Sequence, residues 1–232
     1  MSRHTLTLHA LIASCALCAS EVVFASNLGL AVKASTLGIG LEADYALTEK
    51  FSLRGQVNQF DHDDTFDKDG VKYTGSLELS SFGLLLDWHP MGGGFRVTGG
   101  AYSNGNAISA VGTGEGAYTI GDQTYVVGPT DTLRATADVD LGSSVAPYVG
   151  IGWGHAPSNK GGLLLSFDIG VFFQGTPDAN LAVTGTANNG SADFTSDPTL
   201  QAEVRKEEQN LQNDLSDYEA FPVLSFGIGW RF

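Results

Sequence analysis

Charged side chains recur at alternate positions inside segments that are otherwise apolar or rich in glycine. The basic and acidic members are equal in number: Lys33, Arg54, Arg96 and Arg231 against Glu42, Asp44, Asp87 and Asp168. If these segments are β-strands, the charges lie opposite the apolar residues, because successive side chains of a strand point to opposite faces. Charges enclosed in a narrow space pair with one another or line a water-filled path. The pattern therefore predicts either a salt-bridged core or a polar route for small solutes.

Two polar segments carry an excess of acidic residues. Residues 198–219 hold six acidic residues against Arg205 and Lys206. The other segment sets Lys68 against five aspartates: Asp61, Asp63, Asp64, Asp67 and Asp69. An opening lined by one sign of charge concentrates ions of the opposite sign. We expect an acidic outer mouth that favours cationic solutes; the alternative is that these residues only keep an exposed surface soluble.

Residues suited to catalysis or to metal binding are sparse. His155 and Ser158 resemble the pair found in outer-membrane lipid A deacylases, but their spacing differs by one residue, and a triad needs base and nucleophile within hydrogen-bond reach. Residues 61–70 fit a calcium-binding loop poorly, because its first and twelfth ligands would be Thr65 and Ser76. We expect no catalytic residue, resident metal or cofactor, and leave loose surface binding of calcium open.

Alternation with a period of two marks the elements that would position the charged residues. In residues 163–174 apolar side chains alternate with polar or small ones, and residues 51–58 and 95–102 repeat the pattern. An apolar outer face and a polar inner face are typical of a transmembrane β-barrel. The expected strands are residues 28–34, 37–45, 51–60, 80–88, 95–104, 145–154, 163–174 and 221–232.

The phase of the alternation sets the number of strands. Residues 28–45 are too long for one crossing of the membrane, and the phase of their alternation changes. A two-residue hairpin at Ser35-Thr36, which pairs Ala34 with Leu37, would produce this change. A bulge is the alternative. A second phase change indicates a bulge near Ser80. The prediction is an all-β fold, an antiparallel transmembrane β-barrel of eight strands.

The strand ends and the connections indicate which side of the membrane each end faces. Short connections alternate with long ones, which span residues 61–79, 105–144 and 175–220. Aromatic residues gather at the ends joined by short connections: Tyr45, Phe51, Trp88, Phe95, Trp153, Trp230 and Phe232. Tight periplasmic turns, long external loops and an interfacial aromatic girdle are features of outer-membrane barrels.

Two of the long connections contain elements of their own. Residues 118–120 and 123–127 flank Gly121-Asp122 and predict a hairpin. Residues 199–216 predict a polar helix capped by Asp197, with an apolar stripe that packs over the barrel mouth. The alternative is that this helix is a partner-binding element.

The N-terminus predicts export. Residues 1–25 contain a basic start, an apolar stretch and a cleavage site before Ser26, so the mature domain is expected to be residues 26–232. Cys15 lies in a possible lipoprotein box, which is the alternative. The formal net charge of −14 opposes binding to nucleic acid.

The last strand alternates apolar residues back from the terminal Phe232. This resembles the C-terminal signature by which outer-membrane barrels are recognised for assembly. The expected partners are therefore outer-membrane lipid and the barrel-assembly machinery.

Several short motifs occur in an order that resembles the ornithine-uptake, carbapenem-associated outer-membrane channel family. They are residues 70–73, 118–125, 146–152, 170–177 and 221–223. The resemblance implies an eight-stranded barrel in the cell outer membrane, linked to passage of basic amino acids. The expected function is a narrow channel or uptake protein for small, preferably cationic solutes. The alternative is a closed structural or surface-interaction barrel without transport.

Overall fold

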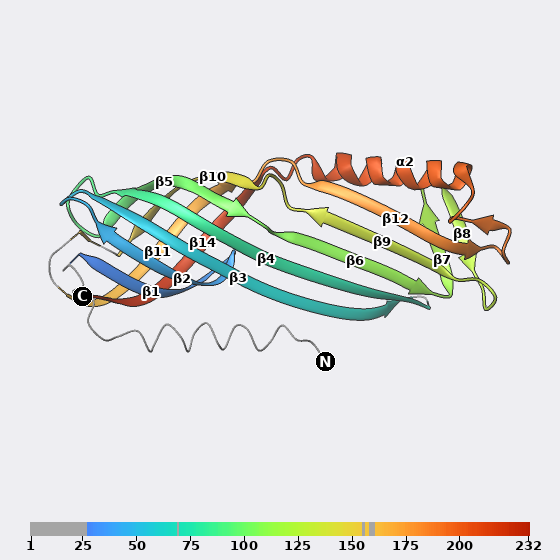
Figure 1. The fold of residues 1–232 in the computed structure, drawn as a ribbon, viewed down its shortest axis with the longest axis horizontal. Helices are drawn as coiled ribbons and strands as arrows, with labels where there is room; N and C mark the ends of the chain where they lie inside the picture. The colour runs from blue at the N-terminus through green and yellow to red at the C-terminus, as the bar shows by residue number, and fades with distance from the viewer. Residues whose placement is uncertain (1–26, 69, 155, 158–160) are drawn as a thin grey trace.

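Eight strands pair side by side and close into a ring. In a computed structural model that describes residues 27–68, 70–154, 156–157 and 161–232, each strand pairs antiparallel with the next, and the last pairs with the first (Figure 1). The ring consists of β1 (Leu28–Ser35), β2 (Gly38–Ala46), β3 (Phe51–Lys68), β4 (Val71–Trp88), β5 (Phe95–Asn104), β10 (Val145–Trp153), β11 (Gly162–Phe173) and β14 (Ala220–Arg231). The predicted eight-stranded antiparallel barrel is confirmed.

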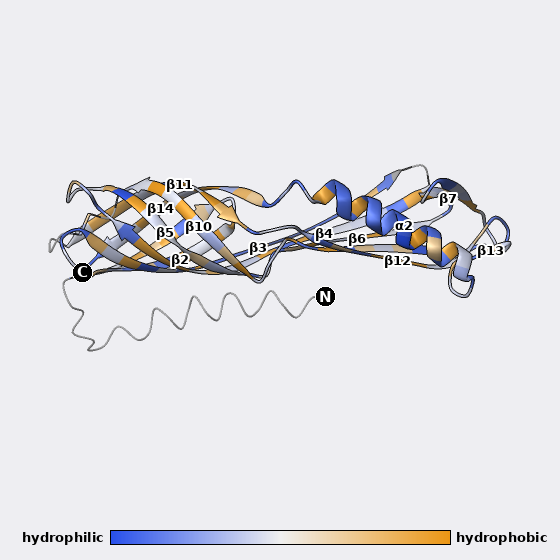
Figure 2. Ribbon diagram, turned by 90° about the horizontal axis from the view of Figure 1, so that it is seen from above, coloured by the Kyte–Doolittle hydropathy of each residue, from blue (hydrophilic) through white to orange (hydrophobic). Residues whose placement is uncertain are grey.

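The barrel strands have an apolar outer face and a polar inner face. Leu165 is 62% exposed on β11, whereas its neighbour Ser166 is buried. Hydrophobic and hydrophilic residues occur together along the barrel strands in Figure 2. At the end away from the long connections, Phe51 pairs with Trp88 and Phe95 with Trp153, so the predicted aromatic girdle gathers at one rim.

The first hairpin turns one residue later than predicted. Ser35 pairs with Gly38 and Ala34 with Ile39, which leaves Thr36 and Leu37 in the turn. The predicted pairing of Ala34 with Leu37 is wrong. Gly38 has φ of +107°, a backbone conformation that favours glycine, and Leu37 is buried inside the barrel rather than facing lipid.

Strands β3 and β4 continue past the barrel, and further strands join them there. Beside β4 lie β6 (Ala107–Gly114), β9 (Leu133–Asp140), β12 (Asp178–Ala187) and the short β13 (Ala192–Asp193). We call this sheet of β3, β4, β6, β9, β12 and β13 the extension (Figure 1). Residues 61–79 and 105–144, predicted as long connections, are therefore mostly strand.

The extension also explains the phase change in β4. Pairing of β3 with β4 is continuous from Phe51–Trp88 to Lys68–Val71, so the predicted bulge near Ser80 is wrong. β4 changes partner from β5 at Ser81 to β6 at Glu78. Beyond that point the inner face of β4 is apolar, because Val71 and Tyr73 pack against other apolar side chains instead of lining a polar lumen.

A second core covers the far end of the extension. The predicted hairpin is present as β7 (Gly116–Ile120) and β8 (Gln123–Val127), with Gly121 at φ of +61°. The buried residues of this core are Val71, Tyr118, Ile120, Tyr125, Val127, Leu133, Val183, Ala187, Ala192, Phe194 and Val204.

The predicted helix is present as α2 (Pro198–Leu215), and Asp197 accepts a hydrogen bond from the Thr199 N–H at its start. Val204 is its buried contact with the second core. The helix lies along β12 rather than over the barrel mouth (Figure 1). In the described part of the chain, no helix is both long and apolar enough to cross a membrane.

Candidate functional site: the barrel lumen

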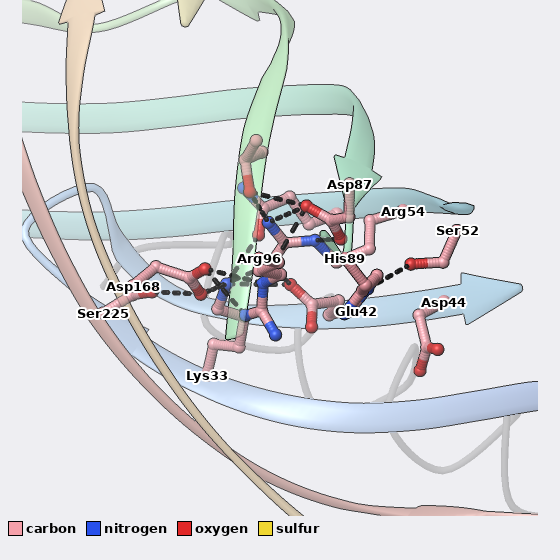
Figure 3. Close-up of polar contacts among 12 residues, drawn as sticks. Lys33, Glu42, Asp44, Ser52, Arg54, Asp87, His89, Arg96, Asp168 and Ser225 are labelled. Atoms are coloured by element: carbon pink, nitrogen blue, oxygen red, sulfur yellow. Dashed lines mark hydrogen bonds and ion pairs between the residues drawn. The ribbon is translucent and has the colours of Figure 1, made fainter. Parts of the chain in front are cut away.

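Six charged side chains form one ion-pair network across the lumen (Figure 3). Lys33 Nζ lies 2.8 Å from Glu42 Oε2 and 3.2 Å from Asp168 Oδ2. Arg54 Nη1 lies 3.1 Å from Glu42 Oε2 and 3.2 Å from Asp168 Oδ2. Arg54 Nη2 donates to Asp87 Oδ1 at 2.9 Å. Because these residues come from β1, β2, β3, β4 and β11, the network ties most of the barrel wall together.

Arg96 of β5 completes the network, and a separate pair lies nearer the barrel rim that carries the short connections. Arg96 Nη2 lies 2.7 Å from Asp168 Oδ1. Arg231 pairs with Asp44 nearer the end of β2. The structure thus places all eight charged residues singled out from the sequence in the lumen, each at most 3% exposed. Four cations face four anions, so the enclosed charge balances.

Inward-facing glycines make room for these long side chains. A Cβ on Gly152 would lie 2.4 Å from Asp168 Oδ1, and one on Gly227 would lie 3.2 Å from Lys33 Cγ. A real Cβ does not tolerate the first distance. Glycine at alternate positions of these strands therefore lets the long charged side chains pack inside the lumen.

An apolar layer lies on the side of the network nearer the extension, and we call it the gate layer. It consists of Leu37, Leu85, Tyr102, Ala146, Tyr148, Phe172 and Val223. The Tyr102 ring lies 5.5 Å from the Tyr148 ring and 5.4 Å from the Phe172 ring, both edge-on. This layer was not predicted from the sequence, although the alternation puts Tyr102 and Phe172 on the same face as the lumen charges.

The space left between network and gate layer is small. The cavity lined by Lys33, Arg54, Tyr102 and Tyr148 offers about 10 Å³ to the centre of a water-sized sphere. That volume suits about one water molecule. The lumen is therefore closed to an amino acid in this structure.

His89 is a further buried polar residue, and it was not predicted as a site residue from the sequence. It follows β4 directly and is fully buried; its Nε2 lies 3.2 Å from Ser52 Oγ and its Nδ1 2.9 Å from Gly93 O. Burial lowers the pKa of His89. The imidazole is therefore neutral at neutral pH.

The aspartates predicted at the outer mouth lie elsewhere. Asp61, Asp63, Asp64 and Asp67 are exposed along β3 in the extension, rather than around the opening of the barrel. Residues 61–68 are strand, not a calcium-binding loop. Among the described residues, no three His, Cys, Asp or Glu gather to hold a metal ion. The predicted signal peptide, Asp69, His155 and Ser158 lie outside the described residues.

The closed ring, the apolar outer face, the aromatic rim and the charged lumen together define an outer-membrane β-barrel protein. The fold is similar to two crystal structures of Acinetobacter baumannii proteins, CarO2 (TM-score 0.57) and CarO (TM-score 0.55). Each is 19% identical to this chain, over 89% of this chain and 98% of its own. The resemblance to the carbapenem-associated outer-membrane family is thereby confirmed at the level of the fold. No family model and no curated protein matches the sequence.

Proposed function

We propose that this protein takes up small solutes across the outer membrane, with a preference for cations such as basic amino acids, through a lumen that is closed at rest. The observation that carries the proposal is the separation of charge along the molecule. Residues 60–79, 105–144 and 175–220, which form the extracellular part, hold twenty acidic and five basic residues, a formal net charge of −15. The whole chain has −14, so the rest is nearly neutral.

This charge would concentrate cations at the outer side of the barrel. A surface of one sign raises the local concentration of oppositely charged solutes, and salt weakens the effect as the Debye length falls to about 8 Å at physiological ionic strength. Inside the lumen, Glu42, Asp87 and Asp168 already bind guanidinium or ammonium groups. A basic amino acid offers these carboxylates the same kind of partner.

A second candidate is a closed barrel that only anchors the extension at the cell surface. The cavity of about 10 Å³ favours it, because transport then requires the gate layer to move. The two candidates share the fold and differ only in whether solutes pass through the barrel.

The experiment measures uptake of labelled arginine by vesicles that contain the refolded protein. We expect the fourfold variant Asp61→Asn, Asp63→Asn, Asp64→Asn, Asp67→Asn to take up arginine more slowly at low salt, with leucine uptake unchanged. At high salt, where the field is screened, variant and parent should agree. Equal arginine uptake by both proteins at low salt would count against the proposal.

We also propose that the barrel-assembly machinery recognises the C-terminal strand through Phe232. The Phe232 N–H bonds to Leu28 O, at the seam where the last strand meets the first. Removing Phe232 should leave export intact and deplete the folded barrel from the outer membrane; wild-type amounts there would contradict this.

A further inference from the structure

The two edge strands of the extension differ in whether another element covers their main-chain groups. Along β12, side chains of α2 bind the main chain: Gln212 Oε1 accepts from the Ala179 N–H at 2.9 Å, and Glu208 Oε2 accepts from the Leu181 N–H at 2.8 Å. Gln201 Nε2 donates to Val183 O at 3.3 Å. The helix therefore seals this edge against another strand.

The opposite edge, along β3, is open. β2 pairs with β3 only as far as Gln59, and residues 60–68 pair with β4 alone among the described residues. The Thr65 N–H bonds to Asp64 Oδ1 at 2.8 Å instead of to a strand. Since alternate residues of a strand direct their main-chain groups to opposite sides, the N–H and C=O groups of residues 61, 63, 65 and 67 point to the open edge.

The side chains along this edge divide by charge and by face. Asp61, Asp63 and Asp67 share the outer face of the sheet, because the register sets them opposite Glu78, Ser76 and Lys72. On the inner face the Phe66 ring stacks on Tyr73 at 5.2 Å, and the Phe60 ring stacks on His62 at 6.2 Å. The edge thus presents main-chain groups that no strand pairs, between an outer acidic row and an inner row in which Phe60 and Phe66 flank His62 and Asp64.

We propose that residues 61–67 of β3 bind an extended basic segment of another protein as an added strand. Main-chain bonds supply affinity in this mode of recognition, and alternate side chains supply specificity. Lysine or arginine on one face of the segment would lie beside the aspartates, and aromatic or β-branched residues on the other would lie beside Phe60 and Phe66. A second copy of this edge is disfavoured as the partner, since like charges would then face each other.

The test uses fluorescence-labelled nine-residue peptides and the refolded full-length protein. A peptide alternating lysine with valine and tyrosine should bind, whereas one with glutamate in place of lysine should not. The same lysine peptide, N-methylated at alternate amides, should bind at least about tenfold more weakly, because it loses main-chain hydrogen bonds to the edge.

Variants of the protein separate the main-chain edge from the acidic row. Thr65→Pro removes an N–H that makes no ladder bond, so the strand should still fold, yet peptide affinity should fall about tenfold or more; Thr65→Val retains the N–H and should bind as the parent does. The triple variant Asp61→Asn, Asp63→Asn, Asp67→Asn should lose affinity at low salt whether or not Thr65→Pro folds. Absence of binding to the lysine peptide, or equal binding of the glutamate peptide, would overturn the proposal.

Discussion

Arg96 Nη2 of β5 lies 2.7 Å from Asp168 Oδ1 of β11, although β10 separates the two strands. Gly152 of β10 pairs with both residues and has no side chain to hold them apart. A Cβ at Gly152 would lie 2.4 Å from Asp168 Oδ1 and 3.0 Å from Arg96 Nε. The ion pair therefore depends on a glycine between its partners.

Gly152→Ala should lower the free energy of unfolding by about 1–3 kcal/mol, the usual cost of overpacking. Urea unfolding in lipid vesicles measures it. Gly99→Ala is the matched control, because a Cβ there meets nothing within 4 Å. Equal effects of the two changes would mean that Gly152 makes no room for the network.

Asp168→Asn should cost about 3–5 kcal/mol of stability, because it removes the carboxylate that Lys33, Arg54 and Arg96 share in a buried site. The exposed pair of Lys206 and Asp122 provides the control. Lys206→Gln should cost about 1 kcal/mol or less, since surface ion pairs contribute little. An Asp168→Asn protein as stable as Lys206→Gln would refute the structural role of the network.

Thinning the gate layer should open the lumen. Phe172 and Leu85 are at most 1% exposed, and apolar constrictions of this kind block ions by excluding water. The double variant Leu85→Ala, Phe172→Ala should show conductance steps in planar bilayers and faster arginine uptake. Phe173→Ala, which changes the neighbouring lipid-facing residue, should behave as the parent. Parent-like conductance in the double variant would exclude the gate layer as the barrier.

Asp131 makes the extension sensitive to acid. Its carboxylate accepts hydrogen bonds from the N–H groups of Gly128, Asn189 and Gly190, and these bonds, that from Gly128 first, hold its pKa below the usual value. The stabilisation is present above the unfolded pKa of about 3.9 and is lost as pH falls through the lower folded pKa.

Protection factors of the Asn189 and Gly190 amides, measured by hydrogen exchange, should therefore hold steady above about pH 4 and decrease below it. In Asp131→Asn the same amides should be less protected at pH 7 and should lack this decrease. An unchanged pH profile in the variant would assign the acid sensitivity to another group.

Period-two alternation was enough to locate the barrel. It gave each barrel strand to within a few residues, except that β3 and β4 run beyond the barrel, and it placed residues such as Arg54 and Asp168 on the inner face. It could not give the extension, because the pairing of β6 with β4 and of β12 with β9 joins segments far apart in sequence, and no local pattern records that. The turn was placed one residue too early because the alternation of apolar residues was taken to begin at Leu37, whereas Leu37 lies in the turn and Gly38, with its positive φ, begins the strand.

The gate layer was missed for a different reason. Tyr102 and Phe172 lie in strands whose inner positions also include glycine, Gly100 in β5 and Gly170 in β11, and composition alone does not show which aromatic rings fill the space beside these glycines. The distances between the rings and the burial of Leu37 were needed to recognise a continuous layer.

Uptake of arginine and glutamate, measured side by side in vesicles with and without the refolded protein at low salt, tests the proposed function most directly. We predict that the protein accelerates entry of arginine well above that of glutamate, and that the difference shrinks as salt is raised. Equal entry of the two amino acids, or no acceleration of either, would contradict selective uptake of cations and leave a closed barrel that anchors the extension.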